Sequence, residues 1–279
     1  MTYQTLLQSA VDEMEEVGID DPSLDAWLLL EAASGLTFTA FHLVGGDEAP
    51  EDVIEKFTAL KNRRIAREPI QLILGNTEFM GLVFEMDGNE LIPRQDTETL
   101  VEEVLSYAKE AADGLTLLDL FTGSGCIATA LAVHGDFQKI YAGDISDKAL
   151  KNAKANAAAH NADVTFRIGD MFEPFEGESF DVITANPPYI KAADIEQLQP
   201  EVRDYDPRLA LDGGEDGLVF YRRLAAQAQE HLSDDGAIFM EIGADQGAAV
   251  CTIFQLAGYE DIRLIKDLCK NDRVVFARK

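Results

Sequence analysis

From residue 115 onwards, short apolar segments alternate with helical segments, and this alternation is the feature that most limits the fold. Seven segments have the length and the branched or aromatic content of strands. They are LTLLDLF (115–121), KIYAGDI (139–145), VTFRIGD (164–170), FDVITAN (180–186), GAIFMEI (236–242), IRLIKDL (262–268) and RVVFARK (273–279). Strands separated by helices form a mostly parallel sheet covered by helices on both faces. The last two segments have no helix between them, so we expect one antiparallel strand.

Residues 1–75 have a different pattern, in which apolar residues recur at helical spacing between short turns. In one helix Asp21 stands at the N-cap position and Pro22 at the first helical position. Another helix carries all the basic residues of the first 92 positions, which are Lys56, Lys61, Arg63, Arg64 and Arg67. They either complement a helix C-terminus on a solvated face or form a docking surface, and we favour the first interpretation.

Residues 76–92 change period, and alternating apolar residues around the turn residue Gly81 predict a short hairpin. The next segment, PRQDTETLVEEVLSYAKEA, predicts a helix capped by Asp96 or Thr97. We therefore divide the chain into three parts. They are an N-terminal helical domain (1–75), a β-hairpin linker (76–92) and an α/β domain (93–279).

The formal net charge of −28 at pH 7 limits the partners of this chain. Binding to duplex DNA relies on Lys and Arg that displace counterions, and a polyanion of this size is repelled instead. A solvated acidic surface is the simpler interpretation of the charge. We expect no direct binding to nucleic acid.

The cysteines and the hydropathy indicate a cytoplasmic protein. Cys126, Cys251 and Cys269 are odd in number and lack metal-ligand spacing, which favours a reducing compartment and no metal site. No apolar run approaches the roughly 20 residues that span a bilayer. The acidic N-terminus has no basic region before an apolar core, so we expect no signal peptide. We expect a monomer that does not bind membranes.

The segment LLDLFTGSGCIATALA has the order strand, glycine turn and helix. Gly123, Gly125 and Ala128 fit the pattern G-x-G-x-x-A, which lets a ligand approach the backbone at a helix N-terminus. Asp144 ends the next strand, 19 positions after Gly125, where its carboxylate can accept from both hydroxyls of a ribose. The pattern predicts a nucleoside site, but dinucleotides and adenosylmethionine share it.

Further carboxylates favour S-adenosyl-L-methionine over NAD. Asp119 precedes the glycine turn, near the site of a cationic amino-acid tail. Asp170 ends the third strand, placed to accept from an adenine amino group, with Met171 against the ring. A pyrophosphate favours neutral or positive neighbours, whereas carboxylates suit a ligand with an ammonium and a sulfonium.

The fourth strand ends in Asn186-Pro187-Pro188-Tyr189, at the edge where open α/β sheets bind ligands. The two prolines stop any helix or central strand and leave a rigid corner rich in carbonyls. The Asn186 side-chain oxygen and the Pro187 carbonyl can each accept one N–H of an NH₂ group, which orients a poor nitrogen nucleophile for methyl transfer. Tyr189 can stack over a planar group. In isolation the motif would be a structural turn, but after a glycine loop we favour the catalytic interpretation.

Nearly the whole chain resembles the peptide chain release factor glutamine N5-methyltransferases, the PrmC/HemK family. The resemblance lies in REPIQLILGNTEFMGLVFEMD, LIPRQDTETLVE, DLFTGSGCIATALA, GDIS, NPPYI, PEVRDYDPRLALDGGEDGLVFYRRL, EIGADQG and the C-terminal NDRVVFAR. It implies a seven-stranded, Rossmann-like class I methyltransferase domain that uses S-adenosyl-L-methionine. It also implies a helical domain that helps to hold the release factor, and a glutamine substrate in a Gly-Gly-Gln motif.

The resemblance also implies residue roles. The cofactor contacts fall on Phe121, Thr122, Gly123, Ser124, Gly125, Asp144, Asp170, Met171 and Asn186. The substrate contacts fall on Asn186, Pro187, Pro188 and Tyr189, of which Asn186, Pro187 and Tyr189 are the catalytic candidates. The chain departs from the family pattern at Phe121, where small residues or glycine are common, at Met171, where some members carry an aromatic, and at Cys269-Lys270.

Some motif residues keep two interpretations. Arg94 either orders the cofactor edge or the substrate backbone, or pairs with Glu98 at a helix start. Arg203, Asp206 and Arg208 either form a lid over the peptide or bridge one another.

Two other functions remain as alternatives. One is an amino-methyltransferase of the N6-adenine type acting on nucleic acid, which needs a basic groove or a target-recognition domain. The other is a non-catalytic cofactor-binding module associated with a translation factor. Such a module is expected to have lost the glycine loop or Asn186, and this chain retains both.

Overall fold

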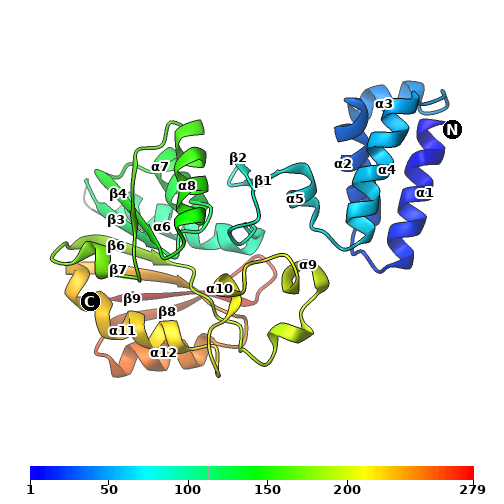
Figure 1. The fold of residues 1–279 in the computed structure, drawn as a ribbon. Coiled ribbons are helices and arrows are strands. Elements are labelled where there is room, and N and C mark those ends of the chain that lie inside the picture. Colours follow the sequence, from blue (N-terminus) through cyan, green and yellow to red (C-terminus); the bar gives the residue numbers. More distant parts are fainter. Residues whose placement is uncertain (112–113) are drawn as a thin grey trace. The chain divides into compact units, whose positions relative to one another are not determined.

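The computed structural model describes residues 1–111 and 114–279, which form two compact units (Figure 1). The first unit contains Met1–Asn76 together with Gln199–Tyr205, and the second contains Thr77–Leu198 and Asp206–Lys279. The assignment of all of 93–279 to one domain did not anticipate that 199–205 belongs with the helical unit.

The first unit is helical throughout. Its helices are α1 (Tyr3–Glu16), α2 (Pro22–Ser34), α3 (Phe38–Val44), α4 (Glu51–Ile65), α5 (Ile70–Leu74) and α9 (Pro200–Arg203). Asp21 caps α2 as predicted, since its side chain accepts a hydrogen bond from Leu24 N at 3.2 Å. Leu29, Leu30 and Phe57 are fully buried between the helices. No single helix of the described chain is long and apolar enough to cross a membrane; α2 and α3 meet that test only as a pair bent by 83°.

The basic side chains of α4 and of the turn after it contact partners inside the first unit. Lys61 pairs with Glu13 at 2.5 Å, and Arg64 pairs with Asp25 at 2.6 Å. Arg64 and Arg67 also bind the two carboxylate oxygens of Glu201, at 2.9 and 2.7 Å. These pairs explain why 199–205 groups with the helices. Arg63 and Arg64 lie in the last turn of α4, where the favoured interpretation placed cations.

The second unit contains a seven-stranded sheet, in agreement with the predicted fold class. Its strands are β3 (Thr116–Leu120), β4 (Lys139–Asp144), β5 (Val164–Ile168), β6 (Phe180–Ala185), β7 (Leu232–Glu241), β8 (Glu260–Lys266) and β9 (Asp272–Arg278). The order across the sheet is β5-β4-β3-β6-β7-β9-β8. All neighbours are parallel except β9, which is antiparallel to both β7 and β8, as expected for strands without an intervening helix.

Helices cover both faces of the sheet (Figure 1). The helices of this unit are α6 (Glu98–Glu110), α7 (Cys126–His134), α8 (Asp147–Ala159), α10 (Arg208–Leu211), α11 (Val219–His231) and α12 (Gly247–Leu256). Side chains of α6 and α7 pack with Leu117 and Val182, whereas those of α11 and α12 pack with Leu118 and Ile183. Successive strand residues point to opposite faces, so this division gives two apolar cores, one on each side.

The predicted hairpin consists of β1 (Asn76–Phe79) and β2 (Leu82–Glu85), which form a separate two-stranded sheet. Thr97 stands at the predicted N-cap position of the next helix, but its side chain makes no capping hydrogen bond. The chain makes a 3₁₀ turn at Gln95–Thr97 and α6 begins at Glu98 without a side-chain cap. The Glu98 carboxylate instead accepts from Met80 N at 2.7 Å, so it joins this helix to the hairpin turn.

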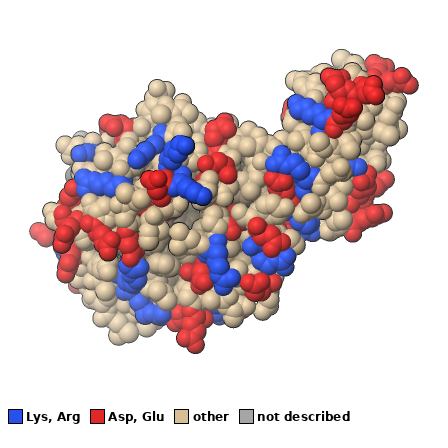
Figure 2. Space-filling view, viewed as in Figure 1, with Lys and Arg blue, Asp and Glu red and all other residues tan. Residues whose placement is uncertain are grey.

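Acidic side chains are spread over the face of the molecule seen in Figure 2, with Lys and Arg interspersed among them. This mixed distribution agrees with a solvated acidic surface as the origin of the net charge of −28.

Candidate active site

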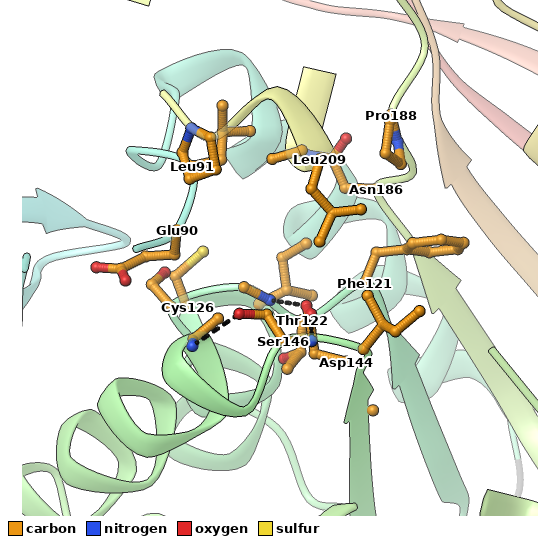
Figure 3. Close-up of a pocket in the computed structure, with 18 of the residues that line it drawn as sticks. Glu90, Leu91, Phe121, Thr122, Cys126, Asp144, Ser146, Asn186, Pro188 and Leu209 are labelled. Atoms are coloured by element: carbon orange, nitrogen blue, oxygen red, sulfur yellow. Dashed lines mark hydrogen bonds between the residues drawn. The ribbon is translucent and has the colours of Figure 1, made fainter. Parts of the chain in front are cut away.

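A cavity of about 270 Å³ lies in the second unit, at the carboxyl ends of β3, β4, β5 and β6. Figure 3 shows Glu90 and Leu91 on one side of it, Asn186 and Pro188 on the other, and Asp144 with Ser146 below them. Ligands of open α/β sheets bind outside this edge. The fold therefore brings the glycine turn and the Asn-Pro-Pro-Tyr corner to one cavity.

The glycine turn has the backbone conformation that its sequence predicts. Gly123 and Gly125 have φ of 54° and 77°, in the left-handed region that favours glycine. A Cβ added to Gly125 would lie 2.9 Å from Ala153 Cβ on α8, so this glycine also allows close packing of the turn. Thr122, Gly123 and Ser124 line the cavity, whereas Gly125 is the N-cap of α7.

The Asp144 carboxylate holds the cavity floor together. Its Oδ2 accepts from Gly123 N at 2.9 Å (dashed in Figure 3), and its Oδ1 accepts from Ser146 N at 2.8 Å. Burial raises the pKa of Asp144, while these backbone donors oppose the shift. A carboxylate offers about four acceptor positions. Two of these are used, so the group retains capacity for two ligand hydroxyls.

Asp170 and Met171 follow β5 at the cavity wall. Asp170 Oδ2 forms an ion pair with Arg223 of α11 at 2.7 Å, which leaves Oδ1 as an acceptor. Met171 has φ of 53° and is nearly buried. Arg223 and Phe220 also line the cavity, and their motif, PEVRDYDPRLALDGGEDGLVFYRRL, was noted without a role for either residue.

Phe121 lines the cavity and adopts a left-handed conformation, with φ of 59°. Its ring packs edge-on against Phe220, with ring centroids 5.3 Å apart. This conformation explains why glycine suits the position, since left-handed backbone costs about 1–2 kcal/mol for a residue with a Cβ.

We expect Phe121→Ala to be less stable than Phe121→Gly by about 1 kcal/mol. Both variants lose the ring contact with Phe220, but only alanine keeps the backbone strain. Urea unfolding of the two variants measures the difference. An alanine variant that is at least as stable as the glycine variant would show that the turn relaxes out of this conformation.

Asn186 directly follows β6, and its half-buried side chain lines the cavity together with Pro188. Within residues 1–111 and 114–279, no hydrogen bond engages the Asn186 side-chain amide or the Pro187 carbonyl. Among these residues, the Asn186 side-chain oxygen is therefore an unpaired acceptor at the cavity wall, and the Pro187 carbonyl is a second unpaired acceptor next to it in the chain. Such acceptors suit the two N–H groups of an amide or an amino group.

Tyr189 and Pro187 do not line the cavity. The Tyr189 hydroxyl lies 3.4 Å from Glu241 Oε1, at the end of the neighbouring strand β7. Burial raises the pKa of Tyr189, and the nearby Glu241 charge adds to the shift. Burial also raises the pKa of Glu241 to about 7, against the opposing effects of the Thr97 hydroxyl and the Arg273 charge.

Asp119 does not reach the cavity, although it was expected near the amino-acid tail of a ligand. It is fully buried, and its two oxygens accept from the hydroxyls of Thr122 at 2.6 Å and Thr184 at 2.7 Å. Burial raises its pKa to about 7. The carboxylate therefore supports the glycine turn from below.

Arg94 pairs with Asp206, at 2.5 Å, and not with Glu98. Asp206 is almost fully buried, and the residues after it, Pro207, Leu209 and Ala210, line the cavity. The pair thus fixes the IPR motif to the cavity-lining loop. Arg203 and Arg208 bind other neighbours, Asp204 and Glu196 among them.

Comparisons with known proteins agree with this architecture. Residues 5–75 match the PrmC N-terminal domain, and residues 111–254 match a methyltransferase domain model. The crystal structure of a methyltransferase from Pyrococcus furiosus shares the fold, with a TM-score of 0.53 at 18% identity over 81% of this chain and 98% of that one. The fold and the cavity at its carboxyl edge define a class I methyltransferase.

Relatives similar over nearly their full length narrow the class. The release factor glutamine methyltransferase of Geobacter sulfurreducens is 42% identical over 277 residues, which cover 99% of this chain and 96% of that protein. The release factor glutamine methyltransferase of Caulobacter vibrioides is 40% identical over 97% of this chain and 94% of that protein. The chain belongs to the release factor glutamine methyltransferase family, as its motifs indicated.

Proposed function

We propose that this chain transfers the methyl group of S-adenosyl-L-methionine to the side-chain amide nitrogen (N5) of the glutamine in the Gly-Gly-Gln motif of peptide chain release factors. The observation that carries the proposal is the corner at Asn186 and Pro187. Its two acceptors have no partner within the described residues, and they stand beside the cavity that the glycine turn also lines.

The donor set of the cavity fits this cofactor. The backbone of 121–125 would hold the amino-acid tail, the remaining acceptor capacity of Asp144 would take the ribose hydroxyls, and Asp170 Oδ1 would take the adenine amino group beside Met171. A Cβ on Gly123 would meet Glu90 Cβ at 3.9 Å, an ordinary contact, so it is the left-handed φ of 54° that favours glycine there. When bound, the cofactor supplies a methyl group on a positively charged sulfur.

The chain's own residues act on the glutamine amide by positioning and electrostatics. The Asn186 oxygen and the Pro187 carbonyl would each accept one N–H of the substrate amide. The amide nitrogen is a poor nucleophile because its lone pair is delocalised, and these bonds draw electron density toward nitrogen and fix its direction. The methylated nitrogen is acidic enough to lose a proton without a dedicated base. Stacking of Tyr189 on the substrate remains part of this proposal.

We propose that the helical unit (1–75) contributes to holding the release factor, with 76–92 as the linker. Support comes from exposed apolar side chains on α2 and α3. Leu43 is 83% exposed and Phe38 is 60% exposed, and the Phe38 ring packs edge-on against Trp27. Exposed apolar groups of this size mark protein-binding surfaces when they cluster. The proposal also includes a monomer and a cytoplasmic location, and the three free cysteines support the location.

Methyl transfer from labelled S-adenosyl-L-methionine to purified release factor tests the function, with peptide mass mapping of the product. We expect one methyl group on the glutamine of the Gly-Gly-Gln motif, and none on a factor in which that glutamine is alanine. Label that enters DNA or RNA instead would favour the nucleic-acid alternative. Cofactor binding without transfer to any of these acceptors would favour the non-catalytic module.

A further inference from the structure

The segment EIGADQG (241–247) follows β7 and lies against the catalytic corner, yet its sequence suggested no chemical role. β6 and β7 are parallel neighbours in which Ala185 is paired with Met240. Asn186 and Glu241 are therefore the next residues on the two strands. The end of β7 is thus one of the two strand ends that flank the corner within the sheet, together with that of β3.

Two side chains of this segment hold Tyr189 at different atoms. The Gln246 amide nitrogen donates to the Tyr189 carbonyl at 2.9 Å and to the Gly217 carbonyl at 3.2 Å. The other end of the same amide accepts from Gly243 N at 3.0 Å. Glu241 Oε1 faces the Tyr189 hydroxyl at 3.4 Å. Tyr189 is thereby contacted at both its main chain and its ring.

The glycines of the loop LDGGEDG (211–217) complete the enclosure. A Cβ on Gly217 would lie 2.4 Å from the Tyr189 carbonyl oxygen, and one on Gly213 would lie 2.8 Å from the Pro188 carbonyl oxygen. The chain beyond the corner is paired with the same loop, because Ile190 N donates to Leu211 O at 3.0 Å. Side chains at these glycines would push the corner out of place.

Glu241 is almost fully buried, and its Oε2 has no hydrogen-bond partner within the described residues. Burying a carboxylate without full pairing costs free energy that a purely structural position would avoid. Similarly, Gln246 uses both donor hydrogens and its acceptor on main-chain groups of three separate segments. Packing alone would require neither a buried carboxylate with an unpaired oxygen nor an amide whose donors and acceptor all bind main-chain groups.

We propose that Glu241 and Gln246 are positioning residues that hold Tyr189, and through it the Asn186–Pro188 corner, in the geometry needed to bind the substrate amide. The inference deepens the proposed function and rests on it for its catalytic consequence. Gln246 acts on the main chain of the corner, and Glu241 acts on the tyrosine ring.

The test compares Gln246→Glu with Gln229→Glu. Glutamate keeps the shape of Gln246 and an acceptor for Gly243 N, but it sets a carboxylate oxygen against two carbonyls. Gln229 on α11 makes a bond of the same kind, from its amide nitrogen to Ala257 O at 3.1 Å, and does not line the cavity. The control variant therefore carries the same chemical change away from the corner.

Three readouts are measured for each variant: kcat/KM for the release factor, the Kd for the cofactor and hydrogen exchange. We expect Gln246→Glu to lower kcat/KM for the release factor roughly 10- to 100-fold, with the Kd for S-adenosyl-L-methionine within about twofold of wild type. Hydrogen exchange at Ile190 and Ala192, whose N–H groups bond to Leu211 and Gly214, is expected to rise. Gln229→Glu is expected to change none of the three readouts. Glu241→Leu is expected to lose more activity than Glu241→Gln, which keeps an oxygen near Tyr189.

The three readouts separate the possible failures. Unchanged exchange and unchanged turnover in Gln246→Glu would overturn the positioning role while the function stands. A large rise in the cofactor Kd would also overturn it and assign Gln246 to the cofactor site. A wild-type enzyme that does not methylate the factor would refute the function, whereas faster exchange in Gln246→Glu alone would still support the hold on Tyr189.

Discussion

Asn186→Ala is expected to lower the rate of methyl transfer by about 10³-fold or more while leaving the cofactor Kd nearly unchanged. The variant removes one of the two acceptors at the corner, and these act on the substrate amide when its nitrogen becomes a nucleophile. Removal of one preorganised hydrogen-bonding group typically costs 10²–10³ in kcat. Loss of orientation adds to that cost. Single-turnover transfer to the release factor and calorimetric titration of the cofactor measure the two quantities.

Asn186→Asp is the matched comparison at the same position. Aspartate keeps an acceptor oxygen at the position of the asparagine oxygen, so we expect Asn186→Asp to retain more activity than Asn186→Ala. The side chain of Asn186 makes no hydrogen bond within residues 1–111 and 114–279, so neither variant should lose much stability. Equal loss of transfer and of cofactor affinity in Asn186→Ala would assign the side chain to the cofactor.

The sequence predicted the sheet and the position of the site because both depend on local patterns. Alternating strand and helix signals give a mostly parallel sheet, and the ends of its strands meet at one edge. The glycine turn and the Asn-Pro-Pro-Tyr corner follow two of those strands, so their meeting in the cavity follows from topology. The lack of a helix between the last two segments was also sufficient to predict an antiparallel strand, which is β9.

Long-range polar contacts were not predictable in the same way. Whether Arg94 pairs with Glu98 or with Asp206 depends on where a loop more than 100 positions away folds back. The grouping of 199–205 with the helices depends on Glu201 meeting Arg64 and Arg67. No periodicity or spacing along the chain predicts that these distant residues lie close together in the fold.

The departures from the family pattern show a further limit of the sequence. Phe121, Met171 and Lys270 all have left-handed backbone, with φ of 59°, 53° and 69°. The sequence identified these positions as unusual, but the reason is a backbone angle that residue identity does not reveal. At Phe121 the chain tolerates this angle where the ring packs against Phe220.

Asp144→Ala is expected to raise the Kd for S-adenosyl-L-methionine about 100-fold or more. The change removes the proposed acceptor for the ribose hydroxyls, and it also leaves Gly123 N and Ser146 N without their acceptor. Hydrogen bonds to a charged group contribute about 1.5–3 kcal/mol each, and roughly 1.4 kcal/mol corresponds to a tenfold change in Kd. The glycine turn is then expected to lose its fixed conformation as well as its ligand. Calorimetric titration of the cofactor measures the change.

Asp181→Ala provides the matched control. Asp181 accepts from Thr116 N at 2.8 Å and from the Ser233 hydroxyl at 2.9 Å, and it stands at the amino end of β6, away from the cavity. It is therefore a carboxylate with similar bonds at the opposite edge of the same sheet. We expect this variant to lose stability but to keep the wild-type cofactor Kd. If both variants weaken cofactor binding equally, the effect of Asp144 is one of general stability and the ribose assignment is wrong. If only Asp144→Ala does so, the carboxylate at the end of β4 acts on the ligand directly, because the two substitutions remove the same kind of group from the same sheet.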